Sequence, residues 1–319
     1  TFITNKEIEE DYTCGKFAVS GKYIYDIIRK LPNEIITIEE VMDSKIYIST
    51  ANISFSLNCN NVDEFPNLEL EESKNPIILS NKVLKNIFNQ TSFAASTQES
   101  RPAITGINFK INKNILECTA TDSYRLAKKV INLDQNVDEE INIIIPTKNL
   151  IELSRMFSDE EETVEIHIFN NKIIFKFGTI IMLSRLINGT YPDVSKLIPN
   201  EFLLKITVST NEFYALLDRV SLFSTEEEKN TIKLECTDNT MVVSSNIPEI
   251  GNVVEKLEVE KNNQENIKIA FSSKYMMDAI KVLDCEKIEL AFNGEIRPIV
   301  IKNPEDENLI QLIVPIKTY

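Results

Sequence analysis

The side chains that most often perform catalysis or bind metals are few in this sequence. It contains one histidine, His167, and five cysteines without a C-x-x-C pair: Cys14, Cys59, Cys118, Cys236 and Cys285. A catalytic triad or a histidine-based zinc site would need His167, and no H-E-x-x-H, G-x-S-x-G or D-x-D arrangement accompanies it. The seven glycines form neither a G-x-x-x-x-G-K-[ST] nor a G-x-G-x-x-G phosphate loop. The residue types predict a protein that is not an enzyme and has no metal or cofactor.

His167 itself lies in the alternating segment VEIHIF. It is in phase with Glu165 and out of phase with Val164 and Ile166. Because alternate side chains of a strand point to opposite faces, this phase places His167 on the polar side. We expect a surface strand residue and not a general base.

The charge balance opposes general binding to nucleic acid. The 319 residues include 49 acidic and 34 basic side chains, which gives a formal net charge of −15. Such a surface repels phosphates, so any DNA contact must be local, and the acidity could serve solubility alone. No apolar run reaches the ~18 residues of a membrane span, and TFITNKEIEE is no signal peptide. Scattered cysteines suit a reducing cytoplasm.

An internal repeat organises the chain. The segments VSGKYIYDIIRKLP (19–32), IPTKNLIELSRMFS (145–158) and FSSKYMMDAIKVLD (271–284) share helical apolar periodicity and an early lysine. Lys22, Lys148 and Lys274 are spaced by 126 residues and again by 126. Each predicted helix precedes alternating segments that predict strands, at 35–57, 163–187 and 287–314.

A second kind of unit precedes two of these helices. It has a predicted helix at 81–96 with strands at 103–111 and 115–122, and again a helix at 209–224 with strands at 231–236 and 240–245. The chain is thus half a repeat and two full repeats, and about fifty residues are expected to be missing before Thr1. The pattern predicts an α+β protein with helices on one face of antiparallel sheets, and domains at 1–70 (second half only), 71–200 and 201–319.

Basic pairs recur on the three repeated helices. Seven residues separate the cations of each pair, which places them on nearly the same helix face; the pairs are Lys22 with Arg29, Lys148 with Arg155, and Lys274 with Lys281. An acid lies four residues after each lysine: Asp26, Glu152 and Asp278. The stripes could be self-paired solvated faces, or they could line a concave surface against a phosphate backbone.

Local sequences also resemble one family. ATDSYRL (120–126), SRLINGTYPDVSKLIP (184–199) and LIVPIK (312–317) resemble the bacterial DNA polymerase III beta-subunit family, the beta sliding clamps. Phe93-Ala94, Arg101-Pro102, Gly106 and Phe65-Pro66-Asn67-Leu68 also lie where motifs of this family would place them. The resemblance covers the whole chain.

The resemblance implies a DNA-clamp architecture and a non-catalytic processivity function. Two chains of three similar domains would form a ring around double-stranded DNA, bound without sequence specificity and located in the bacterial cytoplasm at the nucleoid. The candidate DNA-facing cations are Lys22, Arg29, Lys148, Arg155, Arg219, Lys274 and Lys281. The family directly supports Lys148, and repeat symmetry or helix phase supports the others.

The resemblance also implies a hydrophobic groove. Polymerase catalytic subunit, clamp loader and repair proteins would dock short linear motifs there, at Ile104, Thr121, Ser123, Tyr124, Arg125, Leu126, Pro192, Lys196, Leu197, Pro298, Leu312, Val314, Pro315 and Ile316. Leu126, Leu197 and Ile316 could equally be ordinary core residues. Ser123, Val314 and Lys317 depart from the common Gly, Met and Arg of the family, which affects pocket shape and peptide preference.

The same resemblance implies a homodimer in the intact protein, with Phe55 and Leu57 on one side of the junction and Leu222 and Phe223 on the other. Phe55 and Leu57 could instead be inward core residues. We expect weakened or absent dimerisation in this chain, because the missing half domain would support their strand. An acidic β-rich adaptor that never surrounds DNA is the alternative function, and a hydrolase is a distant third.

Overall fold

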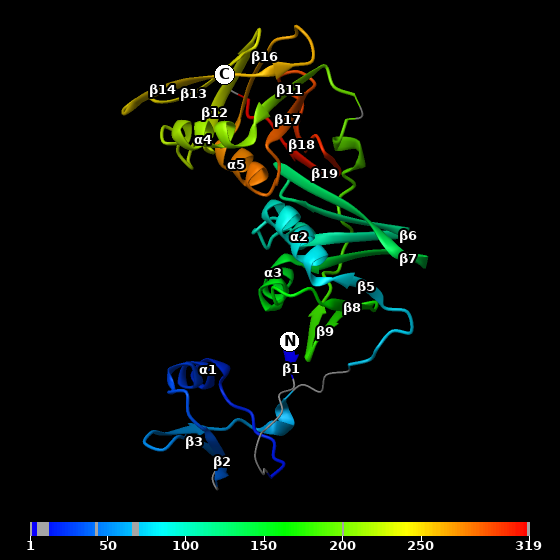
Figure 1. The fold of residues 1–319 in the computed structure, drawn as a ribbon, viewed down its shortest axis with the longest axis vertical. Helices are drawn as coiled ribbons and strands as arrows, with labels where there is room; N and C mark the ends of the chain where they lie inside the picture. The colour runs from blue at the N-terminus through cyan, green and yellow to red at the C-terminus, as the bar shows by residue number, and fades with distance from the viewer. Residues whose placement is uncertain (1, 5–12, 42–43, 66–69, 200, 318–319) are drawn as a thin grey trace. The chain divides into compact units, whose positions relative to one another are not determined.

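The structure is a computed structural model that describes residues 2–4, 13–41, 44–65, 70–199 and 201–317 (Figure 1). The chain forms two compact units, one of residues 1–4 and 72–319 and the other of residues 5–71. The larger unit contains the second and third predicted repeats. Of the family motif at 65–68, Pro66, Asn67 and Leu68 lie outside the described residues.

The second repeat places one helix after its first strand and another before its last three strands. Its elements are β5 (Ile77–Ser80), α2 (Asn81–Thr91), the 3-10 turns η2 (Ser92–Ala94) and η3 (Pro102–Thr105), β6 (Gly106–Thr121), β7 (Arg125–Pro146), α3 (Thr147–Met156), β8 (Thr163–Ile168), β9 (Lys172–Phe177), β10 (Ile180–Arg185) and η4 (Ser195–Leu197).

The third repeat places its two helices in the same way, but it has five strands between them where the second repeat has two. Its elements are β11 (Leu204–Ser209), α4 (Thr210–Ser221), β12 (Thr231–Thr237), β13 (Thr240–Ile247), β14 (Gly251–Glu258), β15 (Glu260–Lys261), β16 (Ile267–Ser272), α5 (Ser273–Lys281), β17 (Lys287–Phe292), β18 (Ile299–Asn303) and β19 (Asp306–Ile313). Figure 1 shows α2 with α3, and α4 with α5, as neighbouring pairs beside the sheets.

The smaller unit contains α1 (Gly21–Lys30) and a three-stranded sheet of β2 (Thr37–Val41), β3 (Lys45–Ser49) and β4 (Ser54–Asn58), with the 3-10 turn η1 (Val62–Glu64). Ile46 and Ile48 of β3 are fully buried. None of the ten residues of α1 is buried. The sheet of this unit therefore rests on a small apolar core.

Serine side chains mark where three of the helices begin. The hydroxyls of Ser80, Ser209 and Ser272 accept hydrogen bonds from backbone N–H groups in the first turns of α2, α4 and α5. These N-caps satisfy donors that have no partner inside the helix. All five predicted helices are confirmed, with ends a few residues shorter than the apolar periodicity indicated.

The strands confirm the α+β class and correct two details. The two strands predicted at 103–111 and 115–122 are one strand, β6, whose register with β7 shifts between Ile111 and Ile115. Such an irregularity lets a long hairpin bend while its ladder continues, so the sequence between the two apolar runs looks like a turn. A second difference is β14, the strand that follows β13, which was not predicted as a separate element.

A seven-stranded sheet crosses from the second repeat to the third. Its order is β15-β11-β17-β18-β19-β7-β6, so the last strand of the third repeat pairs with β7. The antiparallel register joins Arg125 to Ile313 and Lys129 to Leu309. A short strand, β1 (Phe2–Thr4), pairs in the same antiparallel way with β10, the last strand of the second repeat.

Each of the two repeats has its own apolar core, and one side chain touches both. The second-repeat core includes Leu84, Phe109 and Phe175, and the third-repeat core includes Phe213 and Phe271, all fully buried. Phe93, just after α2, packs against both cores. Because the Phe93 ring and the seven-stranded sheet belong to both repeats, the packing between these repeats is continuous.

The prediction for His167 was wrong, because the side chain is only 1% exposed. Its Nδ1 atom accepts a hydrogen bond from the backbone N–H of Ser73 at 3.0 Å. The segment before β5 therefore covers this face of β8, and Lys176 on the next strand pairs with Glu72 of the same segment at 2.6 Å. Alternation gives the face of a strand but does not reveal which connecting segment lies over it.

Gly106 begins β6 where two segments come close together. A Cβ atom at this position would lie 2.5 Å from Ile144 Cγ2, 2.7 Å from the Ile145 carbonyl oxygen and 2.9 Å from Ile187 Cδ1. Backbone oxygen cannot be displaced without moving the strand. Glycine is required here for space and not for its dihedral angles.

We expect Gly106→Ala to lower the free energy of unfolding by about 2 kcal/mol, because the added methyl overpacks the β6–β7 contact. Gly21→Ala is the control, since a Cβ there meets nothing within 4 Å. Urea unfolding followed by circular dichroism measures both variants. Equal midpoints for the two variants would contradict this account of Gly106.

Candidate protein-docking surface and DNA-facing helices

A tight loop between β6 and β7 carries the motif ATDSYRL. The Asp122 Oδ1 atom accepts hydrogen bonds from the backbone N–H groups of Tyr124, at 2.9 Å, and Arg125, at 3.0 Å. The Thr121 hydroxyl accepts one from the Ser123 N–H at 3.1 Å and donates one to the Arg125 carbonyl at 2.6 Å. These short polar side chains satisfy the backbone groups of the loop and so define its shape.

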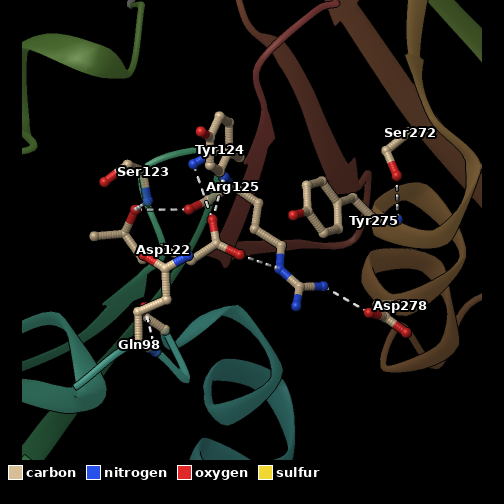
Figure 2. A network of polar contacts seen from close by, with 10 residues as sticks. Gln98, Asp122, Ser123, Tyr124, Arg125, Ser272, Tyr275 and Asp278 are labelled. Atoms are coloured by element: carbon tan, nitrogen blue, oxygen red, sulfur yellow. Dashed lines mark hydrogen bonds and ion pairs between the residues drawn. The ribbon is translucent and has the colours of Figure 1, made fainter. Parts of the chain in front are cut away.

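The Arg125 side chain is held between the two repeats (Figure 2). Its Nε atom lies 3.0 Å from Asp122 Oδ2, and its Nη1 atom lies 2.6 Å from Asp278 Oδ2 on α5. The guanidinium carbon lies 4.4 Å from the centre of the Tyr275 ring and 5.5 Å from that of Phe93. The Arg125 side chain is 12% exposed, so most of it is unavailable to a ligand.

Ser123 adopts a backbone angle that usually belongs to glycine. Its φ is +82°, in the left-handed region where a Cβ is disfavoured. Its hydroxyl accepts a hydrogen bond from Arg101 Nη1 at 2.7 Å. The geometry explains why glycine would suit this position, and it shows a polar contact that glycine could not make.

Leu126 and Leu312 meet beside this loop, one from each repeat. They are paired across the β7–β19 ladder and are both almost fully buried. Their apolar cluster also contains Ala291, Val300, Val194, Ile198, Phe202 and Ile310, of which the last four are partly buried. We call this cluster, together with the exposed residues Tyr124, Leu197 and Val314, the junction surface.

Three exposed apolar residues complete the junction surface. Tyr124, Leu197 and Val314 are all exposed, and the Val314 N–H donates a hydrogen bond to the Tyr124 carbonyl at 2.8 Å. That bond connects the 121–125 loop of the second repeat to the end of the third. Exposed apolar groups beside a buried apolar cluster are typical of surfaces that bind a partner.

The segment before η4 places Lys196 and Leu197 next to this cluster. Asp193 Oδ1 accepts hydrogen bonds from the Ser195 N–H at 3.0 Å and from its hydroxyl at 2.7 Å. The two bonds lower the pKa of Asp193 below its ordinary value. A charged carboxylate at neutral pH therefore stabilises the turn, and the exposed Pro192 precedes it.

Other predicted groove residues lie in different surroundings. Ile104 is buried in a separate cluster with Ile144 and Tyr191, where burial raises the pKa of the Tyr191 phenol. Ile316 donates its backbone N–H to the Ala270 carbonyl at 2.7 Å. It borders a hollow of about 520 Å³ together with Lys317 and residues of β12, β13 and β14. Pro298 and Pro315 are half-buried.

Several residues of the junction surface were missed by sequence reasoning. Val194, Ile198 and Phe202 pack on the cluster, and Tyr275 and Asp278 hold Arg125. The first three occupy a connecting segment without periodicity. Asp278 was interpreted as part of a helical charge stripe, and its contact with Arg125 spans 153 residues of sequence.

The predicted DNA-facing cations are exposed on four helices. Lys22 and Arg29 lie on α1, Lys148 and Arg155 on α3, Arg219 on α4, and Lys274 and Lys281 on α5. The Lys148 side chain is 91% exposed.

Carboxylates neutralise several of these cations. Arg155 pairs with Glu152 at 2.5 Å within α3, and Arg219 forms a two-point pair with Glu255 that lowers the pKa of this acid through its hydrogen bonds. Lys274 lies 3.5 Å from Glu226. For Lys281, the described residues provide no paired carboxylate. Pairs this exposed contribute little to stability, but they weaken attraction to phosphates.

The residues predicted at the interface between two chains lie near two strand edges. Phe55 and Leu57 are half-buried on β4, the edge strand of its sheet. Leu222, at the end of α4, is 76% exposed, and Phe223 lies near β14, within 3.5 Å of the Cβ position of Gly251. β14 is likewise an edge strand of its sheet.

The described ranges contain neither a cluster of metal ligands nor a membrane-spanning helix. No group of three or more His, Cys, Asp or Glu side chains there is placed to hold a metal ion. None of the helices in these ranges has the length and apolar composition that crossing a bilayer requires.

Models of three protein domains match the chain in succession. They are the N-terminal domain of the DNA polymerase III beta subunit over residues 1–69, its central domain over 78–193, and its C-terminal domain over 195–317. The chain belongs to the DNA polymerase III beta-subunit family. It is a DNA sliding clamp, and members of this family are non-catalytic processivity factors.

Relatives of this sliding clamp cover nearly all of it. The beta sliding clamp of Staphylococcus aureus is 40% identical over 317 residues, which are 99% of this chain and 84% of the relative. That of Bacillus subtilis is 39% identical over 316 residues, with the same coverage. The family resemblance of the sequence motifs is confirmed.

Solved clamp structures share the fold. The crystal structure of the Bacillus subtilis DNA polymerase sliding clamp matches with a TM-score of 0.90 and 40% identity, over 94% of this chain and 80% of that chain. The DNA polymerase III beta chain of Streptococcus pneumoniae matches with 0.91 and 32%, over 96% and 82%. The predicted clamp architecture is confirmed.

The left-handed backbone of Ser123 predicts an unusual order of variant stabilities in this clamp. We expect Ser123→Ala to be less stable than Ser123→Gly by about 1 kcal/mol, because only the alanine variant keeps a Cβ at positive φ. Thermal unfolding of both purified variants measures the difference. An alanine variant as stable as the glycine variant would contradict the argument.

Proposed function

We propose that the junction surface is where this sliding clamp docks short apolar peptides of its protein partners. The observation that carries the proposal is the meeting of Leu126 and Leu312 from two repeats, in a cluster whose residues lie close in the chain to the exposed Tyr124, Leu197 and Val314. An apolar floor with a polar rim suits a linear motif that inserts hydrophobic side chains. The partners would be the polymerase catalytic subunit, the clamp loader and repair proteins.

The full set of proposed docking residues is the one predicted from the sequence. Those nearest the cluster are expected to contribute most to binding, since hot spots concentrate where apolar contact is continuous. Arg125 is the exception among them, because its guanidinium is already occupied by Asp122 and Asp278. The substitutions at Ser123, Val314 and Lys317 are expected to tune peptide preference.

We further propose that the exposed cations of α1, α3, α4 and α5 face DNA in a closed ring, within a bacterial cytoplasm and at its nucleoid. Attraction to phosphates is expected to be weak, since Arg155 and Arg219 are paired with acids and the net charge is −15. Binding that releases few counterions depends little on DNA sequence or position and allows sliding. Topological enclosure, and not affinity, would retain the protein.

The strand edges support a head-to-tail homodimer in the intact protein. β19 pairs with β7, and β10 pairs with β1, so the last strand of a repeat repeatedly pairs with a neighbouring sheet. β14 lies 126 residues after the part of β7 that contacts β19, and β4 is the last strand of its repeat. We propose that β4 of one copy pairs antiparallel with β14 of the next.

The ring is proposed to have three domains per chain, at 1–70, 71–200 and 201–319. Association between copies is expected to be weak, since the sheet that carries β4 rests on little more than Ile46 and Ile48. Retention on circular DNA distinguishes a closed ring from copies that bind peptides without surrounding DNA.

We expect Leu197→Ser combined with Val314→Ser to weaken binding of a Gln-Leu-x-Leu-Phe-type peptide by about 30-fold, because two exposed apolar contacts are lost. Fluorescence polarisation with labelled peptide measures this, and unchanged thermal unfolding shows that the variant folds. Ile78→Ser is the matched control, since Ile78 is an exposed apolar residue on β5. The proposal fails if the folded wild type does not bind, or if the control weakens binding equally.

We expect Leu222→Asp combined with Val254→Lys to abolish self-association, because the change places one charge at the end of α4 and one on the β14 edge. Light scattering of the wild type is expected to show a mass that rises with concentration, and that of the variant a constant monomer mass. At concentrations where it self-associates, the loaded wild type is expected to remain on nicked circular DNA and to leave linear DNA. Equal loss from both DNA forms would contradict the proposed closed ring.

A further inference from the structure

We propose that Asp278 of α5 is a positioning residue for the junction surface. It holds Arg125, and through Arg125 it holds the 121–125 loop, across the boundary between the second and third repeats. The inference rests on the docking function proposed above. It assigns a role in peptide binding to a helix residue that is not part of the apolar cluster and belongs to the other repeat from Arg125.

The charges around Arg125 form a bridge with one carboxylate in each repeat. Asp122, in the same loop as Arg125, accepts a hydrogen bond from Arg125 Nε, and Asp278 of α5 accepts one from Arg125 Nη1 (Figure 2). Both contacts are hydrogen bonds between ionised groups, which are about twice as strong as neutral ones. The planar guanidinium fixes the direction of both contacts, which a lysine ammonium would not do.

Two aromatic rings limit the remaining movement of the guanidinium. Tyr275, three residues before Asp278 on α5, lies 4.4 Å from the guanidinium carbon, and Phe93 lies 5.5 Å away. Burial raises the pKa of the Tyr275 phenol, so this ring is neutral at physiological pH. Cations over aromatic faces gain further attraction when water is excluded. The side chain is therefore fixed by α5 and the second-repeat core together.

The position of Arg125 determines the position of the residues that would contact a peptide. Its own backbone N–H and that of Tyr124 are bonded to Asp122, whose other oxygen holds the guanidinium. The Tyr124 carbonyl accepts from the Val314 N–H, and Leu126 follows directly in β7. Loss of the Asp278 contact would free Arg125 and would therefore loosen Tyr124, Leu126 and Val314 together.

The repeat provides a matched comparison for this role. Glu152 of α3 is the counterpart of Asp278, 126 residues earlier. Glu152 is exposed and pairs with Arg155 of its own helix, whereas Asp278 is only partly exposed and pairs outside its helix. The same position in the repeat thus neutralises a cation in α3 and joins two repeats in α5. Glu152→Gln removes an equivalent charge without touching the junction surface.

The test compares Asp278→Asn, Asp278→Glu and Glu152→Gln in the full chain. We expect Asp278→Asn to weaken binding of the Gln-Leu-x-Leu-Phe-type peptide about fivefold, because a charge-assisted hydrogen bond that orients the loop is lost. Asp278→Glu is expected to restore part of the affinity, and Glu152→Gln to leave it unchanged. Arg125→Lys is expected to resemble Asp278→Asn, and the double variant to add little, since both break the same contact.

Hydrogen exchange without peptide gives an independent readout of positioning. We expect faster exchange of the backbone amides at 121–126 in Asp278→Asn, and wild-type exchange there in Glu152→Gln. Unchanged exchange at 121–126 would overturn the inference whether or not peptide binds. Faster exchange with unchanged peptide affinity would also overturn it, because the contact would then be structural only.

Failure of the docking function is distinguishable from failure of this inference. If the wild type does not bind peptide, the docking proposal is overturned, and with it the role of Asp278 in peptide binding. Tyr275→Phe and Tyr275→Leu check the geometry further. The first keeps the ring under the guanidinium and is expected to match the wild type, and the second is expected to weaken binding. Equal affinity of these two variants would count against the inference.

Discussion

The pairing of β19 with β7 is the contact on which the larger unit of this clamp depends. It joins the last strand of the third repeat to the second repeat, so that one sheet belongs to both. Phe93 packs against the two cores, and Arg125 connects the loop beside the ladder to α5. A surface built at this place combines side chains that neither repeat could present alone, and any change of angle between the repeats would alter its shape.

Electrostatics explains how an acidic protein of this family is suited to DNA. Its helices present lysines and arginines, but acids on the same or neighbouring elements pair with several of them. Strong phosphate binding would slow movement along DNA, because contacts between the protein's cations and the phosphates would have to break at each step. Asp278 does not neutralise a cation of its own helix, because its carboxylate pairs with Arg125 of the other repeat.

Repetition made most of the fold predictable from sequence. The 126-residue spacing identified helices α1, α3 and α5, and alternation identified the strands after them. What could not be predicted depends on distant contacts: the covering of His167 by Ser73, the continuity of β6, and the pairing of Arg125 with Asp278. The candidate surface was found through motifs. Residues such as Val194 and Ile198 carried no periodic signal, because they lie in a connecting segment.

Methyl NMR of the clamp titrated with a short apolar peptide tests the central claim most directly. The account predicts that methyl signals from both repeats, those of Leu126 and Val194 as well as Leu312 and Val314, shift together along one saturable binding curve. Shifts limited to one repeat, or shifts only around the hollow that Ile316 borders, would contradict a docking surface built across the β7–β19 junction.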